Sequence, residues 1–192
     1  STLMKLTTEQ LRQIIKEEHS ALLHENNDVV PFDDNAKKII NNMIEERTPE
    51  LREKILQELV NSIGRYDRRI EDRDFLENVL RTLIDTFIGD IIFDYHDGIV
   101  GGGTLHNLPD FSQEDFEMAH DHIEFHPAVE AVIKEINPIM EFTIKMSQIA
   151  RNPDSSLKHG IPKDDAEMLL NILKTGDPMY LLQAFELAGS LI

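Results

Sequence analysis

Apolar residues recur three and four positions apart along most of the chain, and this spacing places them on one face of an α-helix. Polar and charged residues fill the positions between them, as expected for helices with one buried side and one exposed side. Helix-start signals precede several of these runs; they stand at Thr7 with Gln10, at Pro31–Asp34, at Thr48-Pro49-Glu50, at Ser112 with Asp115, and at Asp177-Pro178. The pattern predicts a chain of successive amphipathic helices.

Strand signals are nearly absent, because no alternating apolar run is longer than a few residues. We therefore expect an all-α fold: a single domain over residues 1–192, with about seven or eight helices in a bundle-like or orthogonal arrangement. Residues 4–26 are expected to form an N-terminal amphipathic helix. Residues 97–111, which include Gly101-Gly102-Gly103, are expected to form one long irregular connection. The run at 74–95 has the widest apolar arc and should be the most buried helix.

The acidic composition narrows the classes of partner. The net charge is −17, with 36 Asp and Glu against 19 Lys and Arg. Such a surface repels the phosphates of nucleic acids and of anionic membranes, so we expect no direct nucleic-acid binding and no membrane association. A protein partner with a basic surface is favoured instead. The absence of cysteine excludes thiolate metal sites, thiol catalysis and disulfides, and it fits a reducing compartment such as the cytoplasm.

The acidity is concentrated in one interval. No lysine or arginine occurs between Arg81 and Lys134, whereas the same interval holds eleven acids and five of the eight histidines. On a helix, Glu117 and His120 would share one direction, and so would His122 and His126, because they lie three and four residues apart. These spacings occur in di-iron and zinc sites, and the donor types suit Zn, Fe, Mn or Ni. The two pairs face different sides, however, and a solvated acidic helix would show the same spacings.

A second candidate for metal chemistry lies at the end of the apolar run at 74–95. His96 and Asp97 form an adjacent His-Asp pair of the kind that all-helical metal-dependent phosphohydrolases use. A further upstream histidine in a suitable position is missing, and a histidine near a helix C-terminus is also explained by the helix dipole. The metal candidates are therefore His96, Asp97, Glu117, His120, His122 and His126, and no catalytic residue or organic cofactor site is predicted.

The N-terminus resembles a known segment. Residues Met4–Glu18 read MKLTTEQLRQIIKEE, which is similar to a short N-terminal segment of many otherwise unrelated proteins of tailed bacteriophages. The resemblance covers about fifteen residues and implies a viral association, with a bacterial host cytoplasm as the compartment. It implies nothing about the rest of the chain.

The missing nucleophile and cofactor motifs favour a non-enzymatic protein over an enzyme. We expect a helical interaction or assembly protein that binds a protein partner, and the apolar C-terminal stretch at 179–192 would also allow homo-oligomers. That stretch is equally explained as the last core helix. The alternative function is a metal-dependent hydrolase or oxidase that uses the histidines and carboxylates named above.

Overall fold

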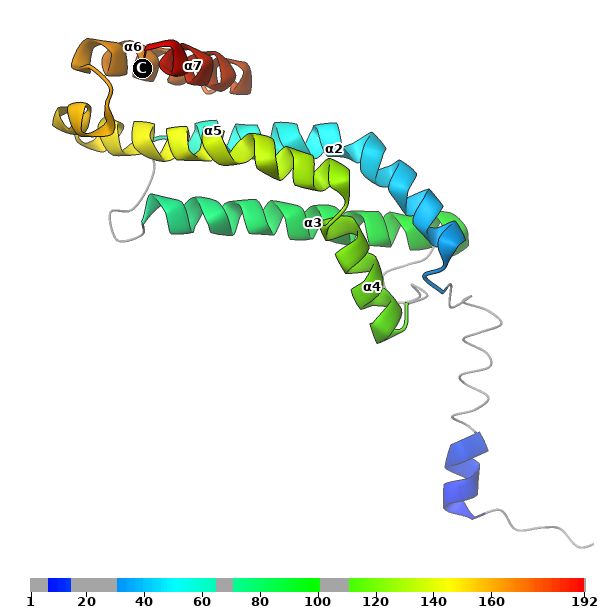
Figure 1. Ribbon diagram of the computed structural model, residues 1–192. Helices are drawn as coiled ribbons and strands as arrows, with labels where there is room; N and C mark the ends of the chain where they lie inside the picture. Colours follow the sequence, from blue (N-terminus) through cyan, green and yellow to red (C-terminus); the bar gives the residue numbers. More distant parts are fainter. Residues whose placement is uncertain (1–6, 15–30, 65–70, 101–110, 192) are drawn as a thin grey trace, which may run out of the picture. The chain divides into compact units, whose positions relative to one another are not determined.

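The computed structural model describes residues 7–14, 31–64, 71–100 and 111–191, and within these ranges the chain is helical and contains no strand. Residues 8–14 are helical. The labelled elements are α2 (Asp34–Ser62), α3 (Asp72–Val100), α4 (Gln113–Glu124), α5 (Pro127–Arg151), α6 (Lys163–Leu173) and α7 (Pro178–Leu191), with short 3-10 turns at Pro153–Ser155 and Leu157–His159 (Figure 1). The predicted all-α fold is confirmed. In the described part of the chain, no helix is long and apolar enough to cross a membrane.

Side-chain caps fix several helix starts where the sequence predicted them. Thr7 and Gln10 bond reciprocally, each side chain accepting from the other residue's backbone N–H at 3.1–3.2 Å. The Asp33 carboxylate accepts from the Ala36 N–H at 2.9 Å, and Ser112 Oγ accepts from the Asp115 N–H at 3.1 Å. Each cap satisfies a backbone donor that the first turn of a helix leaves without an intrahelical acceptor.

The helix start predicted at Thr48-Pro49-Glu50 is wrong. Helix α2 continues through Pro49, and the Thr48 hydroxyl donates back to the Ile44 carbonyl at 2.5 Å instead of capping a new helix. Ile44, Leu51 and Ile55 lie on one buried side of α2 on both sides of the proline. Burial of this continuous stripe outweighs the cost of an interior proline, which is about 3 kcal/mol.

The irregular connection expected at 97–111 is wrong for its first four residues, 97–100. Helix α3 includes residues 97–100, and Gly98 does not adopt the positive φ of a glycine that ends a helix. Glycine only weakens a helix interior, so the helix continues through this position. Residues 101–110 lie outside the described residues. Of the helix expected at 4–26, only 7–14 are described, and 8–14 are helical.

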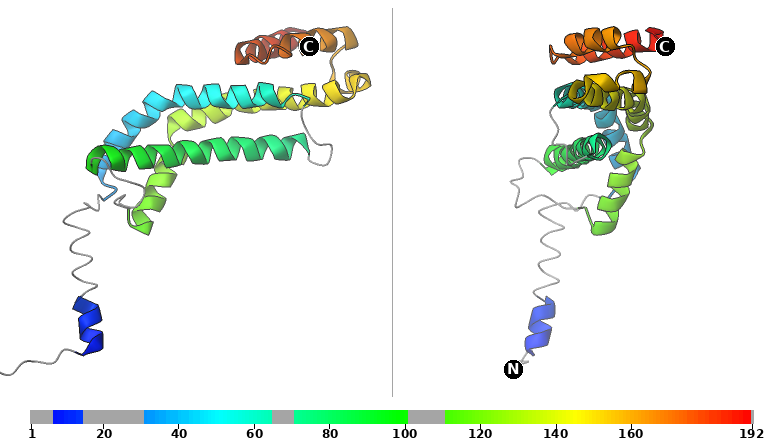
Figure 2. Two further views of the ribbon diagram at one scale, coloured as in Figure 1. Left: turned by 180° about the vertical axis from the view of Figure 1, so that it is seen from behind. Right: turned by 90° about the vertical axis from the view of Figure 1, so that its left-hand side faces the viewer.

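The contacts of the chain group into two compact units. Unit 1 consists of residues 1–42 and 89–123, and unit 2 consists of residues 43–88 and 124–192. In unit 2, the C-terminal part of α2 lies alongside α5, and α6 and α7 lie side by side (Figures 1 and 2). Helix α5 buries eleven residues, whereas Val79, Leu80 and Leu83 of α3 stay half-buried. The expectation that residues 74–95 form the most buried helix is therefore wrong.

Ion pairs join α5 to its neighbours within unit 2. Arg52 of α2 donates to Glu135 through Nε at 3.0 Å and through Nη2 at 2.7 Å. Asp72, at the start of α3, is 3% exposed and accepts from Arg151 at the end of α5. Burial raises the pKa of Asp72, and the charge and hydrogen bond of Arg151 oppose that rise. The Asp72 carboxylate thus depends on one arginine for its charged state.

We expect Arg151→Leu to lower the free energy of unfolding by about 3 kcal/mol, because it leaves the buried carboxylate of Asp72 without its cation. The pKa of Asp72 should then rise further, so the folded state holds a proton that the unfolded chain has lost. Stability should therefore fall as the pH rises through that raised pKa. Urea denaturation near pH 5 and near pH 7 measures both effects.

Arg73→Leu is the matched control. Arg73 makes a two-point pair with Glu141 of α5, but both side chains are 46% exposed, so its loss should lower the free energy of unfolding much less than the loss of Arg151. Equal costs for the two substitutions would show that burial of Asp72 does not set the strength of its pair.

Candidate functional site

Helix α4 carries the densest group of predicted site residues. It runs from Gln113 to Glu124, begins at the Ser112 cap and contains no lysine or arginine. Ala119 and Ile123, four residues apart, are fully buried and fix the inward side of the helix. Because successive residues are rotated by about 100°, the opposite side is formed by Glu114, Glu117 and Asp121, all of which are exposed. The outer side of α4 is therefore an acidic stripe.

Two large apolar side chains of α4 are also exposed. Phe116 is 42% exposed and Met118 is 44% exposed; the helical rotation places Met118 beside the acidic residues and Phe116 nearer the inward side of the helix. The Phe116 ring lies 6.4 Å from the ring of His120, one turn along the helix, but a large part of its surface stays exposed. Aromatic residues and methionine are enriched in protein–protein interfaces. We call Glu114, Phe116, Glu117, Met118 and Asp121 the outer face of α4.

Two of the predicted metal ligands, His96 and His122, lie among aromatic rings of unit 1. His96 is 4% exposed, and its ring centroid lies 4.4 Å from that of Phe111 in an edge-on contact. Phe111 also stacks on Tyr95, at 5.8 Å and an interplanar angle of 12°. The His122 ring meets Phe32 edge-on at 5.4 Å, and its Nε2 lies 2.7 Å from Oδ1 of Asn41. His96 is thus a buried ring of this cluster, and His122 is a half-buried ring beside Phe32.

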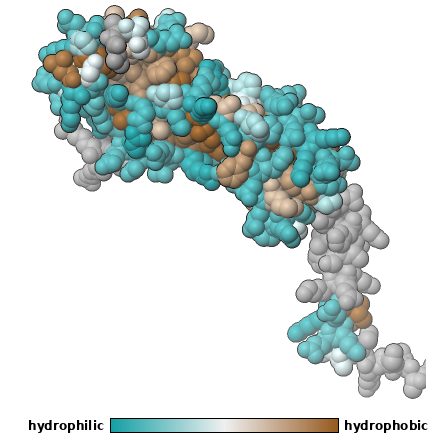
Figure 3. All heavy atoms as spheres, viewed as in Figure 1, coloured by the Kyte–Doolittle hydropathy of each residue, from teal (hydrophilic) through white to brown (hydrophobic). Residues whose placement is uncertain are grey.

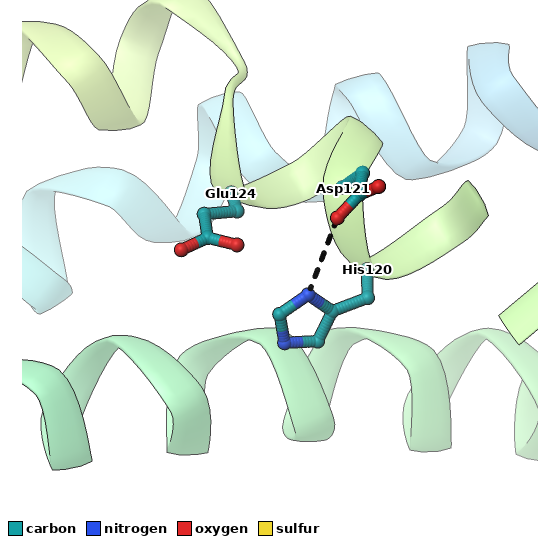
Figure 4. Close-up of side chains that lie close together, drawn as sticks. All are labelled: His120, Asp121 and Glu124. Atoms are coloured by element: carbon teal, nitrogen blue, oxygen red, sulfur yellow. Dashed lines mark ion pairs between the residues drawn. The ribbon is translucent and has the colours of Figure 1, made fainter. Parts of the chain in front are cut away.

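One group of potential ligands does form in the described residues. His120, Asp121 and Glu124 each offer one atom, and these atoms lie within 4.8 Å of one another (Figure 4). The His120 Nδ1 and the Asp121 carboxylate are 3.9 Å apart. The sequence had paired His120 with Glu117, but Glu117 is exposed and accepts from the Gln113 amide at 3.2 Å. The three ligands come from neighbouring positions of α4, with His120 and Glu124 one turn apart.

An arginine competes for one member of this group. Arg81 of α3 donates to Glu124 at 2.5 Å, and the Glu124 side chain is only 17% exposed. A cation bound by Glu124 would have to displace the guanidinium or share the carboxylate with it. This arrangement favours a structural ion pair over a resident metal.

The pair His122 and His126 is not formed on one helix. Helix α4 ends at Glu124, and His126 is the N-cap of α5, where its Nδ1 accepts from the Ala128 N–H at 3.1 Å. Pro127 follows at the first helical position, a common arrangement because proline lacks the N–H that would be unsatisfied there. Asp97 lies half-buried on α3 beside His96. In the described residues the six predicted ligands are not gathered into one group, and the metal site stays a prediction.

The sequence analysis did not identify the outer face of α4, and only for part of this face could exposure have been predicted from helical position. Ala119 and Ile123 mark the inward side, and Met118 lies well away from that direction on the helical wheel, so its exposure could have been anticipated. Phe116 lies close to the inward direction, and its exposure follows only from what packs against α4.

We expect His126→Ala to lower the free energy of unfolding by about 1 kcal/mol, because it removes the cap of α5. His126→Asn should recover the lost stability, since an asparagine side-chain oxygen also accepts a hydrogen bond from a backbone N–H of the first turn. Elemental analysis should give the same metal content for both variants and the wild type. Metal that is bound by the wild type and lost in both variants would instead identify His126 as a ligand.

Comparison with known proteins assigns neither a family nor a function to the chain. No family model matches the chain, and no curated protein or solved structure matches it. The function is therefore inferred from the chemistry of the described residues, with the outer face of α4 as the strongest candidate.

Proposed function

We propose that this chain is a non-enzymatic helical protein that binds a protein partner through the outer face of α4. The partner offers basic side chains to Glu114, Glu117 and Asp121, and apolar surface to Phe116 and Met118. The observation that supports this is the exposure of Phe116 and Met118 on the helix that carries the acidic stripe. Neither an isolated acidic helix nor an isolated apolar patch would specify a partner as narrowly.

The two kinds of residue have different roles in binding. The eleven acids between Arg81 and Lys134 act at long range and speed the approach of a basic surface. Phe116 and Met118 act at contact, where their burial supplies most of the affinity. The same acids repel nucleic acids and anionic lipids, so they also exclude the commonest competing polyanions.

The proposed setting is the cytoplasm of a bacterial cell, with a bacteriophage as the source of the protein. The resemblance of residues 4–18 to segments of phage proteins supports the source, and a chain without cysteine fits a reducing compartment. An assembly or interaction role agrees with this setting.

A photo-crosslinking amino acid at position 118 tests whether the outer face of α4 contacts a partner. We expect a crosslinked protein in the native host at position 118, and none when the same amino acid replaces Asn78, an exposed residue of α3. Mass spectrometry then identifies the partner and its basic segment. Equal crosslinking from both positions would mean that contact at position 118 is not specific.

Affinity for the crosslinked partner should fall about tenfold for Phe116→Ala, which corresponds to about 1.4 kcal/mol. Neutralising Glu114, Glu117 and Asp121 to glutamine should mainly slow association and flatten its dependence on salt. The matched control neutralises Glu45, Glu46 and Glu58, three exposed acids of α2, and so changes the net charge equally. Binding that is insensitive to salt, or equally weakened by the control, would contradict the proposal.

A further inference from the structure

Unit 2 has an apolar groove that the proposed function does not use. It encloses about 520 Å³ and lies between the end of α2, the end of α5 and the whole length of α6. Figure 3 shows apolar side chains gathering over this region of α5 to α7. A groove of this volume with a mainly aliphatic lining is typical of sites for small organic ligands. The aliphatic lining residues are Val60, Ile63, Ile149, Ala150, Ala166, Leu170 and Leu173.

The groove is long and narrow. Its lining along α6 runs from Lys163 to Lys174, so it follows the helix for about 16 Å at about 1.5 Å per residue. Spread over this length, the volume of about 520 Å³ gives a mean width of about 6 Å, whereas a helix with its side chains is about 10 Å wide. An extended peptide would leave backbone N–H and C=O groups without partners against walls of apolar side chains. A single aliphatic chain fits the width and has no polar group to leave unpaired.

Polar groups gather at one end of the groove. Gln57 Nε2 donates to the Gly176 carbonyl at 3.0 Å and to Asn61 Oδ1 at 2.9 Å. A carbonyl only accepts, so Gln57 must present its nitrogen at this point, and Asn61 must turn its oxygen toward that nitrogen. Asn61 lines the groove. The network therefore leaves the Nδ2 group of Asn61 as a hydrogen-bond donor at this end.

Lys174 lines the same end of the groove, two residues before Gly176. Its Nζ donates to the Asn171 side-chain oxygen at 3.4 Å, and it forms no ion pair with any described residue. Glu167, an exposed acid of the lining, precedes Lys174 by seven residues, which is about 10 Å along the helix. The end of the groove near Gly176 thus offers an ammonium and an amide nitrogen, and the walls along the rest of α6 are mainly aliphatic.

We propose that this groove binds one free fatty acid, with its carboxylate at Lys174 and Asn61 and its aliphatic chain along α6. A carboxylate only accepts hydrogen bonds, so it suits these two donors. With bonds of about 1.5 Å, an extended chain of about twelve carbons spans the groove. A phospholipid carries two acyl chains and exceeds its width. The end of the chain lies toward Lys163, whose Nζ is already 3.8 Å from the Asp154 carboxylate. The site uses no residue of the outer face of α4, so it stands independently of the proposed function.

Isothermal titration calorimetry of the full chain with fatty acids of increasing length tests the shape of the site. We expect one dodecanoate to bind per chain, below the concentration at which it forms micelles. From octanoate to dodecanoate the affinity should rise up to about fourfold per methylene, because each added methylene is buried. Hexadecanoate is longer than the groove and should bind about as tightly as dodecanoate. Binding that does not saturate would leave the groove to a peptide segment and would overturn the proposal, as would an affinity that keeps rising with length.

Ala150→Trp tests whether the chain lies in this groove. Ala150 is exposed and lines the groove, so the indole should occupy the space of the aliphatic chain and abolish binding. Ala131→Trp is the matched control, because Ala131 is exposed on the same helix but does not line the groove. Circular dichroism should show that both variants are folded. Unchanged binding by folded Ala150→Trp would place the ligand elsewhere and overturn the proposal.

The position of the carboxylate is tested by comparing decanoate with decanol. Lys174→Gln should weaken the binding of decanoate about tenfold and leave that of decanol unchanged, because only the carboxylate loses its cation. Asn61→Asp keeps an acceptor for Gln57 but repels a carboxylate, so it should also weaken decanoate alone. Lys158→Gln, which removes the charge of an exposed lysine outside the groove, should change neither affinity. Equal effects of Lys174→Gln on the two ligands would overturn the proposal.

Discussion

The burial of one side of α5 is the constraint on which unit 2 depends. Its apolar side packs into the core of that unit. Charged residues at its edges form ion pairs with the neighbouring helices: Glu135 with Arg52 of α2, Glu141 with Arg73 of α3, and Arg151 with Asp72 of α3. The exposed pairs add little stability, whereas the pair of Arg151 with the buried Asp72 matters more because its loss would leave a buried charge without a partner. The end of this same helix, together with the end of α2 and with α6, also lines an apolar groove of about 520 Å³ in unit 2.

In unit 1, a cluster of aromatic side chains lies close to a strongly charged surface. Phe32, Tyr95 and Phe111 contact the rings of His96 and His122, two histidines that the sequence predicted as metal ligands. An imidazole is amphipathic, so it can fill an aromatic core while keeping one polar contact, as His122 does with Asn41. Helix α4 thereby presents its acids and two exposed apolar residues outward from a well-packed inner side.

The outer face of α4 and the apolar groove of unit 2 differ in charge. The outer face carries Glu114, Glu117 and Asp121, and α4 contains no lysine or arginine, whereas the charged residues that line the groove sum to +1. A basic partner of the kind proposed would therefore be attracted to α4 and not to the groove.

The sequence by itself determined the helical class and most helix starts, because periodicity and caps such as Thr7, Ser112 and Asp177 are local and act within one or two turns. It could not decide whether Thr48-Pro49 begins a helix or lies within one, because that depends on burial of Ile44, Leu51 and Ile55 together. It also predicted that His122 and His126 lie on one helix, but α4 ends at Glu124, between the two histidines. Contacts between residues far apart in the chain decided whether Phe116 was covered or exposed. They also decided whether a groove formed beside α6. Only the tertiary structure decided those points, since spacing within a segment carries no information about what packs against it.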